Sequence, residues 1–323
     1  IRACIYIFGL IIFVNGNYTA GTIIAISSYA ARFWQPIMNL GNIFNNFLNN
    51  IAYLERIFET LDEEVDIKDA PDATELPPIK GKVEFENVTF AYEEGHDILK
   101  NFSFTANPGE SIALVGPTGA GKSTIVNLIS RFYDVTKGRV LIDGQDISKV
   151  TLESLRSQMG IMLQDSFIFS GTIEDNIRYG KLDATLDEIK EASKVVCADP
   201  FIEKMSDGYQ TEVKERGSVL SQGQKQLVSF ARTLLSNPAI LILDEATSSI
   251  DVQTERALQQ GLNNMLVGRT SFIIAHRLST IKNCDKILYI ADGGIQECGT
   301  HEELLAKKGA YYKLYTSQME DIA

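Results

Sequence analysis

The sequence is poor in cysteine, and its few cysteines show no arrangement typical of a metal site or a redox centre. The chain has 323 residues, of which four are cysteine. None belongs to a CxxC pair or has a histidine at metal-ligand spacing, so the sequence offers neither a cysteine-based zinc site nor a disulfide framework. We interpret them as reduced, cytosolic thiols. They are Cys4, Cys197, Cys284 and Cys298.

Positive charge is also scarce. The net charge at pH 7 is -12, with 30 Lys and Arg against 42 Asp and Glu. Because binding to nucleic-acid phosphates needs clustered Lys and Arg, the composition argues against a nucleic-acid partner. An anionic ligand must then be held by a local site. The sequence also has no NKxD pattern, which disfavours a GTPase.

The first sixty residues contain almost no charged side chains. Between residues 3 and 58 there is one acidic residue, Glu55, and there are two basic ones, Arg32 and Arg56. The stretch 1–14 is apolar but shorter than the ~20 residues that a bilayer-spanning helix needs, and it starts without Met. We interpret it as the tail of a spanning helix from a longer protein.

A second, longer helical pattern runs from about Gly21 to Thr60, interrupted only by Pro36. At 1.5 Å per residue it reaches roughly 60 Å, about twice the ~30 Å thickness of the hydrocarbon layer. Its first half is apolar, whereas its second half carries amides at spacings of three and four, which places them on one helix face. That face either lines a water-filled pathway or is the solvated side of a cytoplasmic extension, and we favour the second reading. The amides are Asn39, Asn42, Asn46 and Asn49.

The segment 61–80 differs from the helical pattern before it. It is acidic, contains prolines and has little apolar periodicity, so we predict a linker. Residues 1–60 are accordingly predicted to be the C-terminal part of a truncated transmembrane helical domain.

Residues 116–123, with the sequence Gly-Pro-Thr-Gly-Ala-Gly-Lys-Ser, match the phosphate-binding loop pattern. An apolar strand, 111–115, precedes the loop and an amphipathic helix, 123–129, follows it, which is the context that the motif requires. Backbone N–H groups of the loop are then expected to converge on the β-phosphate at a helix N-terminus. Lys122 supplies a positive charge to the β- and γ-phosphates, and the Ser123 hydroxyl can ligate Mg²⁺.

The continuous apolar run 240–243 predicts a buried parallel strand, and two acids follow it. In this class of sheet, that end of the strand lies near the phosphate loop. Asp244 best suits Mg²⁺, directly or through water, and Glu245 can orient or deprotonate the attacking water. The stretch Leu-Ser-Gln-Gly-Gln at 220–224 lies between the loop and these acids. Few nucleotide-binding folds carry such a Ser-Gly stretch at this place.

The region from about Lys82 to Tyr315 resembles the nucleotide-binding domain of ATP-binding-cassette (ABC) transporters, with six motifs in matching order and spacing. With the preceding helices, the chain is similar to an exporter half-transporter of the multidrug and lipid type. The resemblance implies an α/β fold of the P-loop NTPase class. Its parts are a parallel-sheet core, an antiparallel β subdomain and a helical signature subdomain, preceded by transmembrane helices. We expect residues 81–323 to form the nucleotide-binding domain.

The resemblance also implies roles around the nucleotide. Tyr92 is expected to stack on adenine, and Gln164 to reach Mg²⁺ and the lytic water. His276 is expected to contact the γ-phosphate and to help hold Glu245 and the water. The segment 165–177 resembles the surface on which coupling helices of the membrane domain dock.

Two further motifs are implied to act across a dimer interface. Ser221 and Gly223 match ligands of the γ-phosphate, although Gln222 stands where the family usually has Gly, and Asp251 ends a loop that reaches across the interface. The expected catalytic residues are Glu245, His276 and Gln164, the expected metal ligands are Ser123, Gln164 and Asp244, and the expected nucleotide contacts are Tyr92, Gly116, Pro117, Thr118, Gly119, Ala120, Gly121, Lys122, Ser123, Thr124, Ser221, Gly223, Gln224 and Asp251.

Within the docking segment, Phe167 and Phe169 are the expected apolar contacts, and core packing is the alternative for both.

The resemblance implies ATP hydrolysis coupled to export by a head-to-tail dimer. ATP gripped by Lys122 of one subunit would be closed over by Ser221 and Gly223 of the other. The expected cofactors are ATP and Mg²⁺, and the expected partners are a second half-transporter, identical or similar, membrane lipid and an exported substrate of unknown kind. The expected location is the bacterial cell membrane, with the nucleotide-binding domain in the cytoplasm. The alternative function is an ABC-type ATP switch that clamps a partner without transport.

Overall fold

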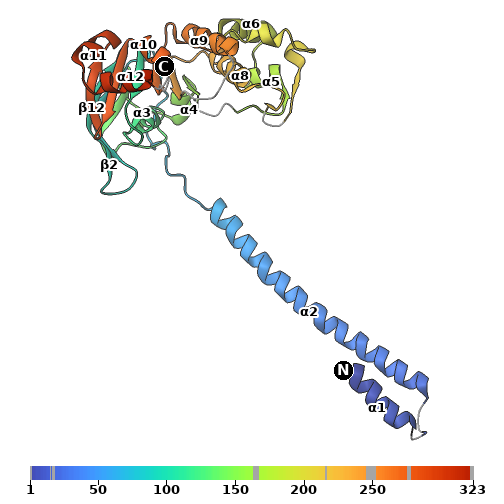
Figure 1. Ribbon diagram of the computed structural model, residues 1–323. Coiled ribbons are helices and arrows are strands. Elements are labelled where there is room, and N and C mark those ends of the chain that lie inside the picture. Colours follow the sequence, from blue (N-terminus) through green and yellow to red (C-terminus); the bar gives the residue numbers. More distant parts are fainter. Residues whose placement is uncertain are drawn as a thin grey trace. The chain divides into compact units, whose positions relative to one another are not determined.

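The structure is a computed structural model that describes residues 2–14, 16, 19–162, 167–214, 217–244, 252–274 and 278–320. The chain divides into two compact units, residues 1–66 and residues 67–323. The second unit thus begins inside the segment that was expected to be a linker. Figure 1 shows the helices and strands of both units.

The first unit consists of two helices, α1 (Arg2–Val14) and α2 (Ala20–Leu61). They pack on each other, and the hydroxyl of Ser27 in α2 donates a hydrogen bond to the Tyr6 hydroxyl of α1 at 3.2 Å. Pro36 lies inside α2 without ending it. Among the described residues, no helix combines the length and the apolar character that crossing a membrane requires. The prediction of transmembrane helices is therefore not confirmed by the structure.

The second half of α2 presents two kinds of exposed side chain. The four asparagines that were predicted to share one face are all exposed, and the Asn39 amide oxygen accepts a hydrogen bond from Gln35 Nε2 at 3.4 Å. Exposed apolar side chains recur at heptad spacing from Ile37 to Leu61. Both readings of the polar face stay predictions.

An antiparallel sheet of four strands forms one part of the second unit. Its strand order is β2-β1-β4-β5. The long strand β1 lies in the middle, where Val83 pairs with Ala106 on one side and with Ile142 on the other. The strands are β1 (Val83–Ala91), β2 (Asp97–Ala106), β4 (Lys137–Ile142) and β5 (Gln145–Asp146).

A six-stranded sheet in the order β12-β11-β3-β10-β9-β6 forms the core of the second unit. The pairs from β11 to β6 are parallel, and only the pair of β11 and β12 is antiparallel. The predicted parallel core is therefore a mixed sheet, because a tight turn returns the chain from β11 to β12. The strands are β3 (Ser111–Val115), β6 (Met159–Met162), β9 (Ile240–Asp244), β10 (Thr270–Ile274), β11 (Lys286–Ala291) and β12 (Gly294–Gly299).

The central sheet separates two hydrophobic cores. In β3, Ala113 and Val115 belong to one core, and Ile112 and Leu114 belong to the other. This alternation follows from the two-residue period of a strand, and burial on both faces explains why β3 is apolar without interruption. Such a sheet holds the carboxyl ends of its strands in fixed positions at one edge.

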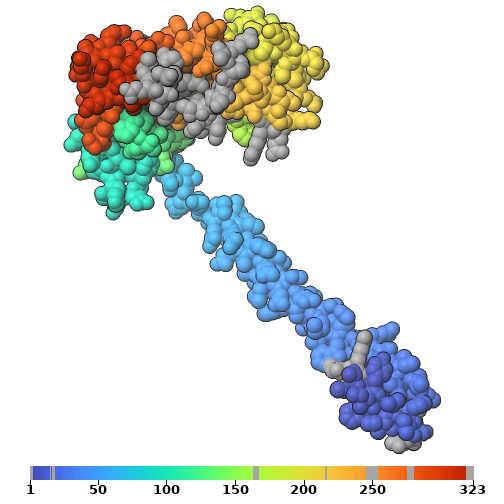
Figure 2. Space-filling model, in the orientation of Figure 1, coloured from blue at the N-terminus to red at the C-terminus, as the bar shows by residue number. Residues whose placement is uncertain are grey.

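Helices cover the sheet and build a separate helical part. In Figure 2, the antiparallel strands (teal) and the carboxyl-terminal helices (red) lie on one side of the second unit, and α6 and α8 (yellow) lie on the other. The short strands β7 (Gly171–Thr172) and β8 (Glu212–Val213) pair beside the helical part. The helices are α3 (Lys122–Ile129), η1 (Ile147–Lys149), α4 (Leu152–Arg156), α5 (Ile173–Arg178), α6 (Leu186–Val195), α7 (Asp199–Ile202), η2 (Gly208–Gln210), α8 (Gln222–Leu235), α9 (Val252–Leu266), α10 (Leu278–Lys282), α11 (His301–Lys307) and α12 (Ala310–Glu320).

Candidate nucleotide-binding site

The phosphate loop connects β3 to α3 and depends on glycine for its backbone conformation. Gly116, Gly119 and Gly121 have φ angles of +142°, +80° and +97°, a region that side-chain-bearing residues rarely adopt. Gly121 is the N-cap residue of α3 and makes no side-chain cap. The first N–H groups of α3 therefore point to the loop without an intrahelical partner, which favours an anion at this position.

Lys122 is the first residue of α3 and turns back over the loop. Its Nζ donates hydrogen bonds to the carbonyl oxygens of Gly116 and Pro117, both at 2.8 Å. Burial lowers the pKa of the Lys122 ammonium, and the negative charge of Asp244 opposes this shift. The carbonyl oxygens of the loop thus hold the Lys122 ammonium at the place where a phosphate is expected.

A cavity of about 390 Å³ joins the phosphate loop to the end of β9 and to Tyr92, the residue after β1. Four residues that were assigned to the nucleotide from separate motifs, Tyr92, Lys122, Ser123 and Asp244, line this one cavity. Lys122, Ser123 and Asp244 come together at the carboxyl ends of the strands because β3 and β9 are both neighbours of β10 and run parallel to it. The remaining lining residues are Ile98, Thr118, Gly119, Gly121, Thr124 and Ile274.

The residues at the cavity fit a divalent cation. Ser123 is exposed, and Asp244 is partly exposed at the end of its strand. A hydroxyl and a carboxylate are oxygen ligands of the kind that Mg²⁺ prefers, and the bound phosphates of a nucleotide usually supply others. Mg²⁺ binding stays a prediction that these side chains are suited to fulfil.

Tyr92 lies at the cavity in a group of aromatic rings. Its ring centroid is 4.8 Å from that of Phe90 and 4.9 Å from that of Tyr133. Its hydroxyl lies 3.2 Å from the hydroxyl of Thr124, which is buried, so Thr124 contacts the aromatic group as well as the loop. Sequence reasoning missed Tyr133 and Ile98. Tyr133 is an aromatic residue shortly after α3, and this place close behind the phosphate-loop motif was a signal in the sequence that could have identified it.

Four of the predicted site residues lie outside the described residues. They follow strands whose carboxyl ends are described: β6 ends at Met162, β9 at Asp244 and β10 at Ile274. These strands are neighbours in the central sheet, and they end at the edge that carries the phosphate loop. The four residues are Gln164, Glu245, Asp251 and His276.

The signature residues do not line the cavity. Ser221 is the N-cap residue of α8, and its hydroxyl accepts a hydrogen bond from the Gln224 N–H at 3.3 Å. In return, Gln224 Oε1 accepts one from the Ser221 N–H at 2.9 Å, which completes a capping box. Gly223 is buried, and Gln222 is exposed at the first position of α8. The structure therefore splits the predicted nucleotide contacts into two groups on one chain.

The predicted docking residues form an exposed aromatic group. Phe167 and Phe169 are 57% and 40% exposed, and Phe169 also stacks near Tyr179, which is 60% exposed. The guanidinium of Arg232 in α8 lies over the rings of Phe169 and Tyr179, at 5.4 and 5.9 Å from their centroids. Burial lowers the pKa of Arg232. Both phenylalanines lie at the surface of the described chain, and Tyr179 and Arg232 were missed by sequence reasoning.

Comparison with known proteins identifies the family of this domain. Residues 99–248 match the family model described as ABC transporter. The chain is 50% identical to the uncharacterized ABC transporter ATP-binding protein YknV of Bacillus subtilis (strain 168), a match that covers 96% of this chain and 52% of that protein. It is 44% identical to the ATP-dependent lipid A-core flippase of Syntrophus aciditrophicus (strain SB), over 99% of this chain and 53% of the relative.

A solved structure agrees with these matches. The structure of a bacterial Atm1-family ABC exporter with ATP bound superimposes with a TM-score of 0.76 at 41% identity, and covers 93% of this chain and 52% of that one. The chain spans about half the length of the proteins that it matches. Its second unit has the fold of an ABC transporter nucleotide-binding domain, a class of ATPase domain. That part of the predicted fold is confirmed, with a mixed central sheet in place of the expected parallel one.

Proposed function

We propose that this chain is the ATP-hydrolysing part of an ABC exporter, together with the last helices of its membrane domain. The observation that carries the proposal is the single cavity in which Tyr92, Lys122, Ser123 and Asp244 meet. The relatives support the part of the proposal that concerns export, since one is named a lipid A-core flippase and the similar solved structure is an exporter. Multidrug or lipid export is the function that we infer for the whole protein.

In this proposal, each cavity residue has a defined task. Tyr92 stacks on the adenine ring, and the N–H groups at the start of α3 hold the β-phosphate. Binding of ATP would draw the Lys122 ammonium from its two carbonyl partners, which lie 2.8 Å away, to the β- and γ-phosphates. Bound Mg²⁺, held by Ser123 and Asp244, would neutralise developing charge on the phosphates.

Three residues outside the described part complete the proposed reaction. Glu245 orients or deprotonates the attacking water, His276 contacts the γ-phosphate, and Gln164 reaches Mg²⁺ and the water. The described strands β9, β10 and β6 end close before these residues in the chain, at the edge where the cavity lies. This order of strands supports their assignment to one site.

We further propose that two subunits pack head to tail. Ser221 and Gly223 lie at the start of α8 and are not lining residues of the cavity beside Lys122. A second half-transporter, identical or similar, would present these two residues to the γ-phosphate. Each donor at such a site is worth roughly 3 kcal/mol, so an incomplete site is expected to hydrolyse ATP about 100-fold more slowly.

The first unit is proposed to belong to the membrane domain of a longer protein. The match to YknV covers 96% of the chain, which is more than the second unit alone accounts for. The full-length protein would then lie in the bacterial cell membrane, in contact with its lipids, with the nucleotide-binding domain in the cytoplasm.

A mixing experiment tests the composite site. The variants Lys122→Ala and Ser221→Ala are each expected to lose at least about 100-fold of the ATP turnover when assayed alone. In a mixed dimer, a head-to-tail arrangement pairs the intact loop of one subunit with the intact signature of the other, so about half of the wild-type turnover per dimer returns. If both groups acted on one nucleotide within a single chain, mixing would restore nothing.

A matched control separates capping from catalysis. Ser221→Ala also removes an N-cap, which costs about 1 kcal/mol of stability. Thr185→Ala removes the equivalent capping box of α6, a helix that carries none of the predicted nucleotide contacts. It is expected to lower the melting temperature as much as Ser221→Ala does, with ATP turnover retained. Loss of turnover in the Thr185 variant would contradict the assigned role of Ser221.

A further inference from the structure

The segment at the start of the second unit is bound tightly to the nucleotide-binding domain. We name residues 68–80 the connecting strap, because they lie in the chain between α2, which ends at Leu61, and β1, which begins at Val83. Thr74 forms a parallel bridge with Val150, and the Thr151 N–H donates to the Thr74 carbonyl oxygen at 3.0 Å. The side chain of Leu76 is buried with 5% exposure in the core around the antiparallel sheet. The strap is therefore a packed part of the domain.

Polar side chains of α4 and of the residues after it hold the backbone of the strap. Ser154 Oγ accepts a hydrogen bond from the Leu76 N–H at 2.9 Å. The Gln158 amide accepts one from the Ile79 N–H at 2.9 Å and donates one to the Leu76 carbonyl at 3.2 Å. Gln158 immediately precedes β6, the strand that leads to Gln164. The strap thus contacts the residues that lead directly into a predicted catalytic segment.

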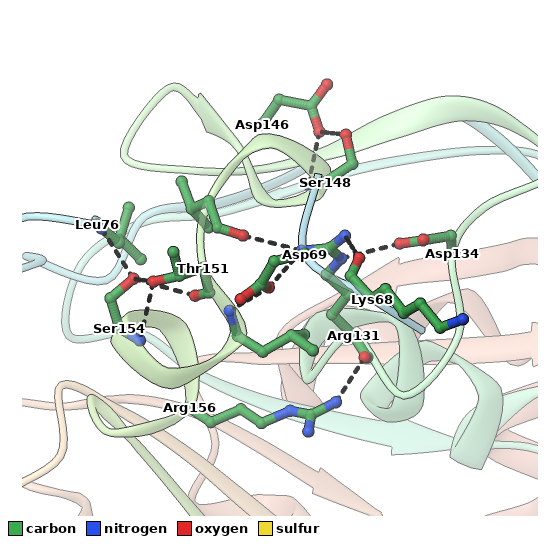
Figure 3. Close-up of polar contacts among 12 residues, drawn as sticks. Lys68, Asp69, Leu76, Arg131, Asp134, Asp146, Ser148, Thr151, Ser154 and Arg156 are labelled. Carbon is green, nitrogen blue, oxygen red and sulfur yellow. Dashed lines mark hydrogen bonds and ion pairs between the residues drawn. The ribbon is translucent and has the colours of Figure 1, made fainter. Parts of the chain in front are cut away.

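Arg131 joins the strap to the end of α3 (Figure 3). Its side chain is 2% exposed, and its Nη2 donates to the Lys68 carbonyl at 3.3 Å while its Nη1 donates to the Val150 carbonyl at 2.9 Å. Its Nε bonds to the Asp134 carboxylate at 3.0 Å. One planar guanidinium therefore bonds at the same time to the strap at Lys68, to Val150, which pairs with the strap, and to Asp134, which follows α3. The single ammonium group of lysine does not offer this geometry.

The backbone of Arg131 belongs to the carboxyl end of the phosphate-loop helix. Its φ is +49°, which is uncommon for a residue other than glycine. Arg156 of α4 donates to the carbonyls of Ser130 and Arg131 at 3.2 and 2.8 Å and so satisfies carbonyls at the end of α3. From this end to the phosphate loop, α3 has only eight residues, or about 12 Å of rigid helix.

We propose that Arg131 is a positioning residue for ATP hydrolysis, which sets the position of the phosphate loop by fixing α3 to the connecting strap. The inference rests on the proposed function of the nucleotide cavity. The nucleotide phosphates would move with α3, whereas Asp244 belongs to the central sheet. A loosened strap would therefore leave ATP bound to its loop but misalign it with the groups at the ends of the strands.

The first test replaces Arg131 by lysine in the full chain. Arg131→Lys keeps the positive charge but loses the forked guanidinium group with its several N–H donors. It is expected to lower kcat for ATP hydrolysis about tenfold, which is less than the ~100-fold that a 1 Å misplacement can cost. The KM for ATP is expected to change much less than kcat. Arg139→Lys is the control, because that arginine is 57% exposed and forms an ion pair with Glu86 at the surface, away from the strap. An unchanged kcat in Arg131→Lys would overturn the proposal.

A reversible lock distinguishes positioning from general stability. Thr74 and Val150 are bridge partners, so Thr74→Cys with Val150→Cys can form a disulfide between the strap and the domain. Combined with Arg131→Lys, this lock is expected to restore kcat when oxidised and to lose it again when reduced. Oxidation of Arg131→Lys without the cysteine pair is expected to change nothing. A formed disulfide that leaves kcat low would overturn the proposal.

A second variant loosens the strap without touching Arg131. If Arg131→Lys does not fold, Leu76→Ala removes the buried anchor of the strap, and the same fall in kcat and the same recovery on locking are expected. Wild-type kcat in folded Leu76→Ala would count against the proposal. The failure of the proposed function has a different signature, since the wild-type chain itself would then show no ATP turnover.

Discussion

Gly116 is the position where the phosphate loop approaches the neighbouring strand most closely. It is the first residue after β3, with a φ of +142°. A Cβ atom placed on it would lie 2.1 Å from the carbonyl oxygen of Ile290 in β11, whereas such contacts under 3.0 Å are essentially never found. Gly116→Ala therefore forces the loop and β11 apart by about 1 Å, because the obstacle is backbone and cannot rotate away.

The expected cost of this change has two parts. A side-chain-bearing residue in this backbone region costs about 1–3 kcal/mol, and overpacking against a rigid neighbour costs about 1–3 kcal/mol more. Together they predict a loss of about 4 kcal/mol in the free energy of unfolding. For a domain of this size, such a loss lowers the melting temperature by about 10 °C. ATP turnover is expected to fall by at least about tenfold, because the loop carries the phosphate ligands.

Gly119 supplies the matched control within the same loop. Its φ is +80°, but a Cβ there would meet nothing within 4 Å. Thermal unfolding without nucleotide is the assay, since it excludes effects on ligand binding. Gly119→Ala is expected to lose only the backbone part, about 1 kcal/mol, and so to melt well above Gly116→Ala. Equal melting temperatures for the two variants would refute the argument from close approach.

Three further predictions concern the stability of the domain. Phe272→Ala empties a fully buried position in β10 and is expected to cost about 3–5 kcal/mol in denaturant unfolding. Arg232→Met removes guanidinium bonds to the Asn176 amide and carbonyl oxygens, and is expected to cost about 3 kcal/mol and to speed hydrogen exchange in α5. His301 bonds to the Tyr311 hydroxyl at 2.7 Å, and burial lowers its pKa below the ordinary 6.5, so the unfolded state binds the proton more readily. Stability is therefore full above that value and falls as the pH drops below it; the fall in melting temperature from about pH 7.5 to about pH 5.5 is expected to be smaller in His301→Gln.

The phosphate loop could be predicted because its information is local. Strand, loop and helix are consecutive in the chain, and the glycines with positive φ stand inside the motif itself. β9 could also be predicted as a buried parallel strand, since continuous apolar strands of this kind are buried on both faces, and the structure confirms this. Ile98 could not be found in the same way, because it lies in β2, outside the motif, and reaches the cavity through the packing of the antiparallel sheet.

The signature stretch 220–224 shows how the same residues can have both a structural role and a functional role. Ser221 and Gln224 have the spacing of a capping box, and the structure shows that box at the start of α8. Sequence reasoning assigned both residues to a nucleotide and missed their local role. The two roles are compatible, since a hydroxyl that accepts from the Gln224 N–H still has its own proton to donate.

The connecting strap shows why composition is a poor guide to whether a segment packs on a domain when the segment is held through its backbone N–H and carbonyl groups. Its acidic and proline-bearing sequence is typical of a linker, and Leu76 is the one strap residue with a buried apolar side chain among those described. What binds it are partners some 60 to 80 residues away, such as Arg131, Ser154 and Gln158, which bond to its N–H and carbonyl groups. Every residue except proline offers the same two backbone groups, so the strap's own side chains carry little record of this attachment. The attachment is encoded in the partners: the buried guanidinium of Arg131 bonds to Asp134 and Val150, and the strap supplies a further acceptor, the Lys68 carbonyl oxygen.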